Sequence, residues 1–133
     1  INITRAATYG PQVITGISVP SGWTSARFTI KHPDNVTEPD QISAIIQVLV
    51  SSTPAAGDGL VVLNKSASGL TAADATLSIG GTEATITIAD HISARLRVAT
   101  RLVYDIKFYH GSSLSTETTY GVCNVVSAVT QVV

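Results

Sequence analysis

The sequence predicts an all-β fold, a two-sheet antiparallel β-sandwich of the immunoglobulin-like kind, with seven to eight strands and one short helical turn near residues 90–97. Apolar and polar residues alternate at period two in several short windows, as they do in strands with one buried face. Gly, Pro, Asn and Asp separate these windows, and β-branched residues outnumber good helix formers. Short strands with regular turns are typical of a β-sandwich, and an up-and-down barrel is the main alternative.

The first half of the chain contains a weakly patterned start, one strictly alternating strand and one apolar central strand. Residues 1–22 alternate weakly and contain two prolines, so we expect either a first strand with a loop or an arm that orders on a neighbouring subunit. Residues 26–30 alternate strictly, and the turn-forming residues 32–35 end that strand. Residues 42–50 are almost continuously apolar, which predicts a central strand covered on both faces, and residues 60–63 form a shorter run.

The second half begins with a hairpin signal and the helical turn. Residues 75–79 and 84–88 read as two strands joined by Gly80-Gly81-Thr82. Asp90 is a suitable N-cap for a short helix, in which Ile92 and Leu96 share one face.

The last two strands are predicted at residues 102–108 and 119–126, with a turn at residues 110–113. In the first of them one apolar face points inward, made of Leu102, Tyr104, Ile106 and Phe108. Val103, Asp105, Lys107 and Tyr109 occupy the other face. The expected core consists largely of aliphatic and phenylalanine side chains, with these at its centre: Phe28, Ile46, Ile86, Ile106 and Phe108.

Composition limits the classes of partner. Residues 1–133 suit a single domain, because each half of the chain would be too short to form a good hydrophobic core. A net charge of −1 and a pI near 6.3 predict neither nucleic-acid binding nor attraction to an anionic membrane. Only 13% of the residues are charged, so repulsion between copies is weak. The chain is therefore either a neutral β-protein or a subunit that packs against other subunits.

The residues that could carry chemistry do not form a known pattern. His32, with Asp34 and Asp40, could in principle ligate a metal, but no His/Cys spacing of the zinc kind is present. Cys123 lies in an apolar run, which favours a buried, inert thiol over a nucleophile. No Gly-x-Ser-x-Gly elbow occurs. We expect no catalytic residue, no cofactor and no metal site, and hence no enzyme.

Two aromatic residues are the candidate partner-binding residues, Trp23 and Tyr109. Trp23, the single tryptophan, follows Pro20-Ser21-Gly22 and is either an exposed anchor for a partner or a residue that closes one end of the core. If both rings are accessible, they could instead stack on a sugar. A carbohydrate-binding or adhesin-type module is therefore the alternative function.

Several segments in order resemble the small β-sandwich domains of tailed-phage virions, such as the N-terminal domain of baseplate upper proteins. These segments are residues 84–88, 92–96, Val103-Tyr104-Asp105-Ile106, Thr119-Tyr120-Gly121-Val122 and Ala128-Val129-Thr130, and residues 23–31 resemble the first long strand of those domains. One departure is Arg101, which stands where those domains usually have a glycine.

This resemblance implies a non-enzymatic structural subunit of a virion, either a capsid decoration protein or a tail or baseplate component. Its expected partners are other virion proteins and copies of itself, so a homo-oligomer or other multi-copy assembly is expected.

Overall fold

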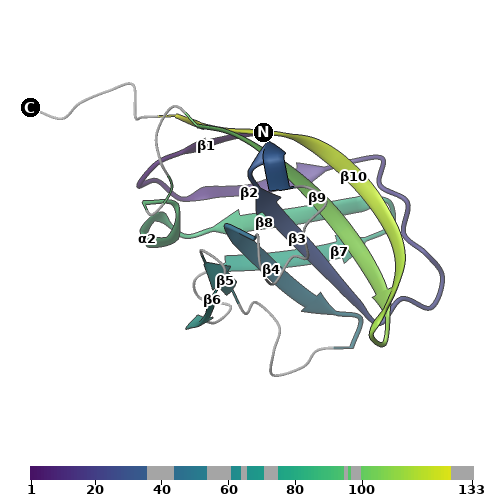
Figure 1. Cartoon of the computed structure of the whole chain (residues 1–133). Helices are drawn as coiled ribbons and strands as arrows, with labels where there is room; N and C mark the ends of the chain where they lie inside the picture. The colour runs from purple at the N-terminus through teal and green to yellow at the C-terminus, as the bar shows by residue number, and fades with distance from the viewer. Residues whose placement is uncertain are drawn as a thin grey trace, which may run out of the picture.

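The described residues form two sheets with ten strands, as a computed structural model shows (Figure 1). The model describes residues 1–35, 44–53, 61–63, 66–70, 75–94, 96 and 100–126. The larger sheet, sheet A, contains in spatial order β1 (Asn2–Thr4), β10 (Ser113–Val126), β9 (Thr100–His110), β3 (Ser25–Lys31), β4 (Ile46–Ser51), β5 (Val61–Leu63) and β6 (Ser66–Leu70). Sheet B contains β2 (Tyr9–Ile14), β8 (Glu83–Ile88) and β7 (Ala75–Gly80). The predicted all-β fold with two sheets is confirmed.

The strand count and one pairing differ from the prediction. The described ranges contain ten strands where seven to eight were expected, because β1, β2 and β6 have too little alternation to be recognised. Among the described strands every pairing is antiparallel except that of β1 with β10, which is parallel. A parallel pair needs a long connection, and nearly the whole chain lies between these two strands.

Residues 1–22 belong to the fold of the single chain. They supply β1 to sheet A and β2 to sheet B. The side chains of Ile3 and Ile17 are buried in the same core as the rest of the molecule. This segment therefore contributes strands to both sheets and side chains to their core.

The hydrophobic core lies between the two sheets and takes residues from both. All five predicted central core residues are fully buried: Phe28, Ile46, Ile86, Ile106 and Phe108. Each such side chain contributes about 1.5–3 kcal/mol relative to an exposed position. The inward faces predicted for β3 and β9 are therefore confirmed. The opposite face is not simply solvated, since Thr29, Lys31 and Val103 are only 1%, 4% and 8% exposed.

Two hairpin turns have the geometry that their sequences predict. Gly80 pairs with Glu83, and His110 pairs with Ser113, so each turn has two central residues. The first central residue is glycine in both, with φ of +60° at Gly81 and +59° at Gly111. Glycine adopts this conformation without steric cost, and it is the position where a type II′ hairpin turn requires it.

The predicted helical turn is present but shorter, and its N-cap is a different residue. Helix α2 spans Asp90–Ser93, and its N-cap is Ala89 instead of Asp90. The Asp90 carboxylate lies within the first turn and accepts a hydrogen bond of 2.7 Å from the backbone N–H of His91. Ile92 and Leu96 are buried, as the spacing predicts. The expectations for Asp40, Ile42 and residues 128–130 fall outside the described residues.

Candidate functional site

One end of the molecule consists of the turn between β9 and β10 and the segment that directly precedes β3 (Figure 1). We call it the hairpin end. Thr24 fixes the two parts together. Its backbone N–H donates to the carbonyl oxygen of Tyr109 at 2.8 Å, and its hydroxyl donates to the same oxygen at 3.1 Å. The hydroxyl oxygen also accepts a bond of 2.7 Å from the N–H of Gly111. In Figure 1 this end lies at the lower right, at the far tip of the two long strands.

Trp23 closes the hydrophobic core at the hairpin end. It is half-buried and packs against the core cluster. Its ring meets that of Phe108 edge to face, with centroids 5.5 Å apart and planes at 77°. Such a pair adds about 0.5–1.5 kcal/mol to the burial of the rings. The structure shows that Trp23 packs at the edge of the core, and its contact with a partner stays a prediction.

Tyr109 lies on the opposite face of sheet A from Phe108, because successive side chains of a strand alternate. It is half-buried, and the guanidinium carbon of Arg27 lies 4.5 Å above its ring centroid. This is a cation–π contact within the usual range. Trp23 and Tyr109 therefore share one end of the molecule but not one face, and they do not form a common stacking platform.

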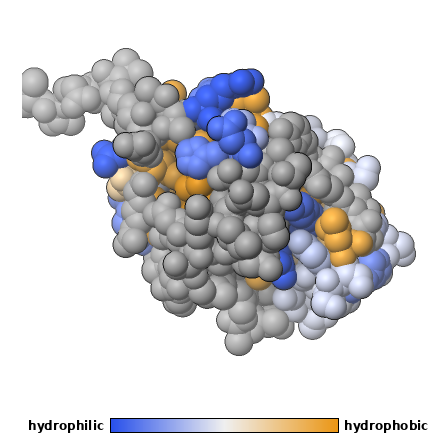
Figure 2. Space-filling model, in the orientation of Figure 1, coloured by the Kyte–Doolittle hydropathy of each residue, from blue (hydrophilic) through white to orange (hydrophobic). Residues whose placement is uncertain are grey.

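Leu114 is the most exposed large apolar side chain among the described residues, at 54%. It is in register with Tyr109 across the β9–β10 ladder, so the two side chains lie on the same face. Val13 and Val126 are the other exposed large apolar residues, at 44% and 38%. In the view of Figure 2, the apolar surface of the described residues occurs in separate small areas.

The outer face of sheet A around Tyr109 carries polar and charged residues, which we call the charged face. Its described members are Arg27, Thr29, Lys31, Gln47, Asp105, Lys107 and Tyr109, aligned by the registers of β3 with β4 and β9. Most of this face is withdrawn from solvent, since Thr29 and Lys31 are only 1% and 4% exposed. The Gln47 amide donates to the Thr29 hydroxyl at 3.0 Å. The Lys107 ammonium lies 3.6 Å from the Asp105 carboxylate.

Arg27 forms no ion pair with another of the described residues. It stands directly opposite Lys107 in the β3–β9 ladder. Its Nε is buried and has no hydrogen-bond partner in the described part of the chain. Like charges directly opposite one another destabilise a sheet, so the guanidinium is held here at a cost in stability.

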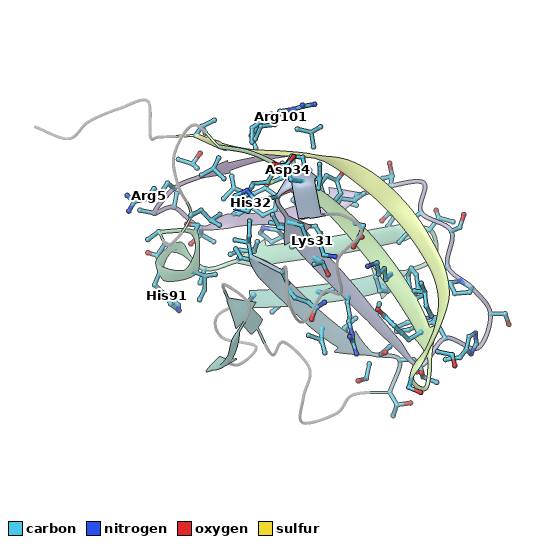
Figure 3. All side chains as sticks on the ribbon, in the orientation of Figure 1. Arg5, Lys31, His32, Asp34, His91 and Arg101 are labelled. Carbon is cyan, nitrogen blue, oxygen red and sulfur yellow. The ribbon has the colours of Figure 1, made fainter. Side chains whose placement is uncertain are left out.

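The titratable groups considered from the sequence do not come together. His32 directly precedes η1 (Pro33–Asn35) and Asp34 lies in it, and both are exposed, whereas His91 lies in α2 (Figure 3). His110 is exposed at the hairpin turn. Within the described ranges no group of three or more His, Cys, Asp and Glu side chains could hold a metal ion.

The thiol of Cys123 and the hydroxyl of Tyr9 are buried in the core and stay protonated at neutral pH. Burial raises the pKa of the fully buried Cys123 thiol to about 11, so the thiol is protonated at neutral pH. Burial, with Cys123 nearby, raises the pKa of Tyr9 to about 12. A protonated, enclosed thiol is a packing group and a poor nucleophile.

Two residues of the site were not singled out from the sequence. Leu114 follows Gly-Ser-Ser and stands between two serines, and an isolated leucine beside a predicted turn is the signal that could have found it. Arg27 carries no local signal, because its contact with Tyr109 depends on the pairing of two strands far apart in the chain.

Comparisons of the chain with protein-family models, with curated proteins and with solved structures find no match. In the described part of the chain no helix is long and apolar enough to cross a membrane.

Proposed function

We propose that the chain is a non-enzymatic structural subunit of a phage-like virion, a capsid decoration protein or a tail or baseplate component, and that it acts by packing against other proteins. The observation that supports this most is the hairpin end. An exposed leucine stands beside a tyrosine on which an arginine is stacked. Tyrosine and arginine are enriched among the residues that dominate protein–protein binding energy.

The order of elements gives further support to the virion role. Four of the segments that resemble tailed-phage β-sandwich domains begin in consecutive elements, β8, α2, β9 and β10. We also propose that the two sheets form an immunoglobulin-like β-sandwich, since core residues come from both sheets. With few charges on the chain, copies approach one another with little repulsion. A homo-oligomer of closed cyclic symmetry is the form that we expect.

In the proposed mechanism Leu114 is buried by the partner while the turn that presents it stays rigid. The three hydrogen bonds of Thr24 hold the turn before binding. Little conformational entropy is then lost when the partner docks, which favours binding.

Co-sedimentation tests this function, with the full chain mixed with particles of its source. We expect the wild type to pellet with the particles, and Leu114→Ser to bind at least about tenfold more weakly, a loss of about 1.4 kcal/mol. The matched control is Val13→Ser, because Val13 is a similarly exposed apolar residue but lies on sheet B. A stable monomer that does not bind the particle, or equal losses in both variants, would contradict the proposal.

A further inference from the structure

The turn that follows β1 is strained at Ala6. The backbone N–H of Ala7 donates to the carbonyl oxygen of Thr4 at 3.2 Å, which closes a four-residue turn. Ala6 is the third residue of this turn and has a φ of +63°, a conformation that a type II turn requires at that position. Glycine adopts it freely, whereas the Cβ of alanine makes it unfavourable. The other residues with positive φ in the described part of the chain are all glycines.

The strand before this turn is short and lies at the edge of the described sheet A. It pairs with β10 in a parallel ladder, and the side chain of Ile3 is fully buried in the core. Arg5, directly after the strand, donates from its backbone N–H to the carbonyl oxygen of Val126 at 2.8 Å and from its Nε to that of Leu96 at 3.0 Å. These partners lie far from β1 in the sequence, so a second copy of the chain can supply the same contacts.

We infer that β1 exchanges between two copies of this chain, so that residues 1–5 of each copy bind beside β10 of the other. The exchanged contacts are the same as the closed ones, so the turn largely decides between the two forms, together with the entropy of association. Opening the turn extends Ala6 and removes its unfavourable φ, at the cost of the hydrogen bond between Ala7 and Thr4. Short strained connections favour exchange of this kind. Ala6 and Thr8 are exposed, so the turn lies at the surface, where it can open.

The exchanging strand lies at the opposite end of β10 from the hairpin end (Figure 1). β1 pairs with residues 124–126, whereas Leu114 lies beside the turn at the start of β10. The exchange therefore goes beyond the proposed function and does not depend on binding to a particle. Reciprocal exchange between two copies gives a closed, two-fold symmetric dimer.

A disulfide between β1 and β10 tests the exchange. Asn2 and Asn124 are in register, and the Nδ2 of Asn124 donates to the Oδ1 of Asn2 at 3.3 Å, so cysteines at these positions should form a disulfide. The variant carries Asn2→Cys and Asn124→Cys with Cys123→Ala, and it is oxidised at high protein concentration. We expect covalent dimers in non-reducing electrophoresis. The matched control, Ser78→Cys with Thr85→Cys and Cys123→Ala, joins two strands of one hairpin and should give monomers with an internal bond. Monomers alone in the first variant, or as many dimers in the control, would overturn the inference.

Substitution of the turn residue tests the cause of the exchange. Ala6→Gly removes the strain of the closed turn, so the dissociation constant of the exchanged dimer, measured by sedimentation equilibrium, should rise about tenfold, or about 1.4 kcal/mol. Ala7→Gly is the control, because the φ of Ala7 is not positive, and it should change the dissociation constant by less than about twofold. An unchanged dissociation constant in Ala6→Gly would overturn the inference.

Isotope-filtered nuclear magnetic resonance of the wild type decides if the cysteine variant does not fold. Equal amounts of ¹³C-labelled and unlabelled chain are mixed by unfolding and refolding them together. Ile3 and Val125 are in register and buried, so exchange predicts nuclear Overhauser effects between their methyl groups on differently labelled copies. A monomer at all concentrations, or a dimer without these effects, would overturn the inference. If these effects are present but the wild type does not bind the particle, the packing function fails and the exchange stands.

Discussion

Replacing Phe108 with alanine is the perturbation that tests the packing of the hairpin end and the core together. The Phe108 side chain is fully buried and in register with Ala26, whose small side chain leaves room for the ring. Removing a buried phenylalanine ring costs about 3–5 kcal/mol, through the lost burial and the cavity left behind. The edge-to-face contact with Trp23 is lost as well, which adds to the cost of the ring itself. We therefore expect a loss of about 4 kcal/mol in the free energy of unfolding.

Chemical denaturation followed by tryptophan fluorescence measures this loss directly, because Trp23 is the only tryptophan and touches the substituted ring. Circular dichroism gives a second probe, and the two transitions should coincide. The matched control is Tyr109→Ala, which removes the next aromatic side chain on the opposite, half-buried face. The control should cost less, about 1–2 kcal/mol. A loss below about 1 kcal/mol for Phe108→Ala, or a larger loss for the control, would refute the assignment of the two faces.

Three further changes test other parts of the molecule. Gly121→Ala should lower the free energy of unfolding by about 1–3 kcal/mol, because a Cβ there would lie 2.7 Å from the hydroxyl oxygen of Tyr104, whose ring packs on Phe28. The control in thermal denaturation is Gly80→Ala, where the added Cβ meets open space. Equal effects of the two substitutions would contradict the reasoning. Thr29→Val should lower the free energy of unfolding, measured by urea denaturation, by about 1–3 kcal/mol, since it removes the hydroxyl oxygen that accepts the 3.0 Å hydrogen bond from Gln47. An unchanged free energy of unfolding would show that this bond is dispensable. Burial raises the pKa of the Cys123 thiol from 9.0 to about 11, so the unfolded chain releases this proton at lower pH than the folded chain does. The free energy of unfolding should therefore fall as pH rises from about 9 to about 11, and it should fall less steeply in Cys123→Ala. Identical pH slopes in the wild type and the variant would argue against a buried thiol.

Local signals were sufficient for most of the sheet. The hairpins at Gly81 and Gly111 were predicted because a glycine in a two-residue turn is a short-range feature. The alternation of β3 and β9 gave the correct core face for the same reason. The pairing of β1 with β10 could not be predicted, because it joins opposite ends of the chain and leaves no local pattern. In β2 an irregular register between Tyr9 and Gln12 interrupts the alternation.

The candidate site was predicted only in its parts. Tyr109 was identified as an aromatic residue, but its stacking with Arg27 follows from the pairing of Ser25 with Tyr109. The packing of Trp23 against the core depends on the position of Phe108. Such facts belong to strand register, which the local pattern of a single sequence does not determine.

Differential hydrogen exchange of the full chain, free and bound to its source particle, tests the protein-packing function most directly. Exchange reports on protection of individual backbone segments. Binding through the hairpin end predicts added protection in residues 109–114 and 22–27, with little change in β7 and β8 of sheet B. Protection confined to sheet B, or no change anywhere on addition of the particle, would contradict the proposed interface.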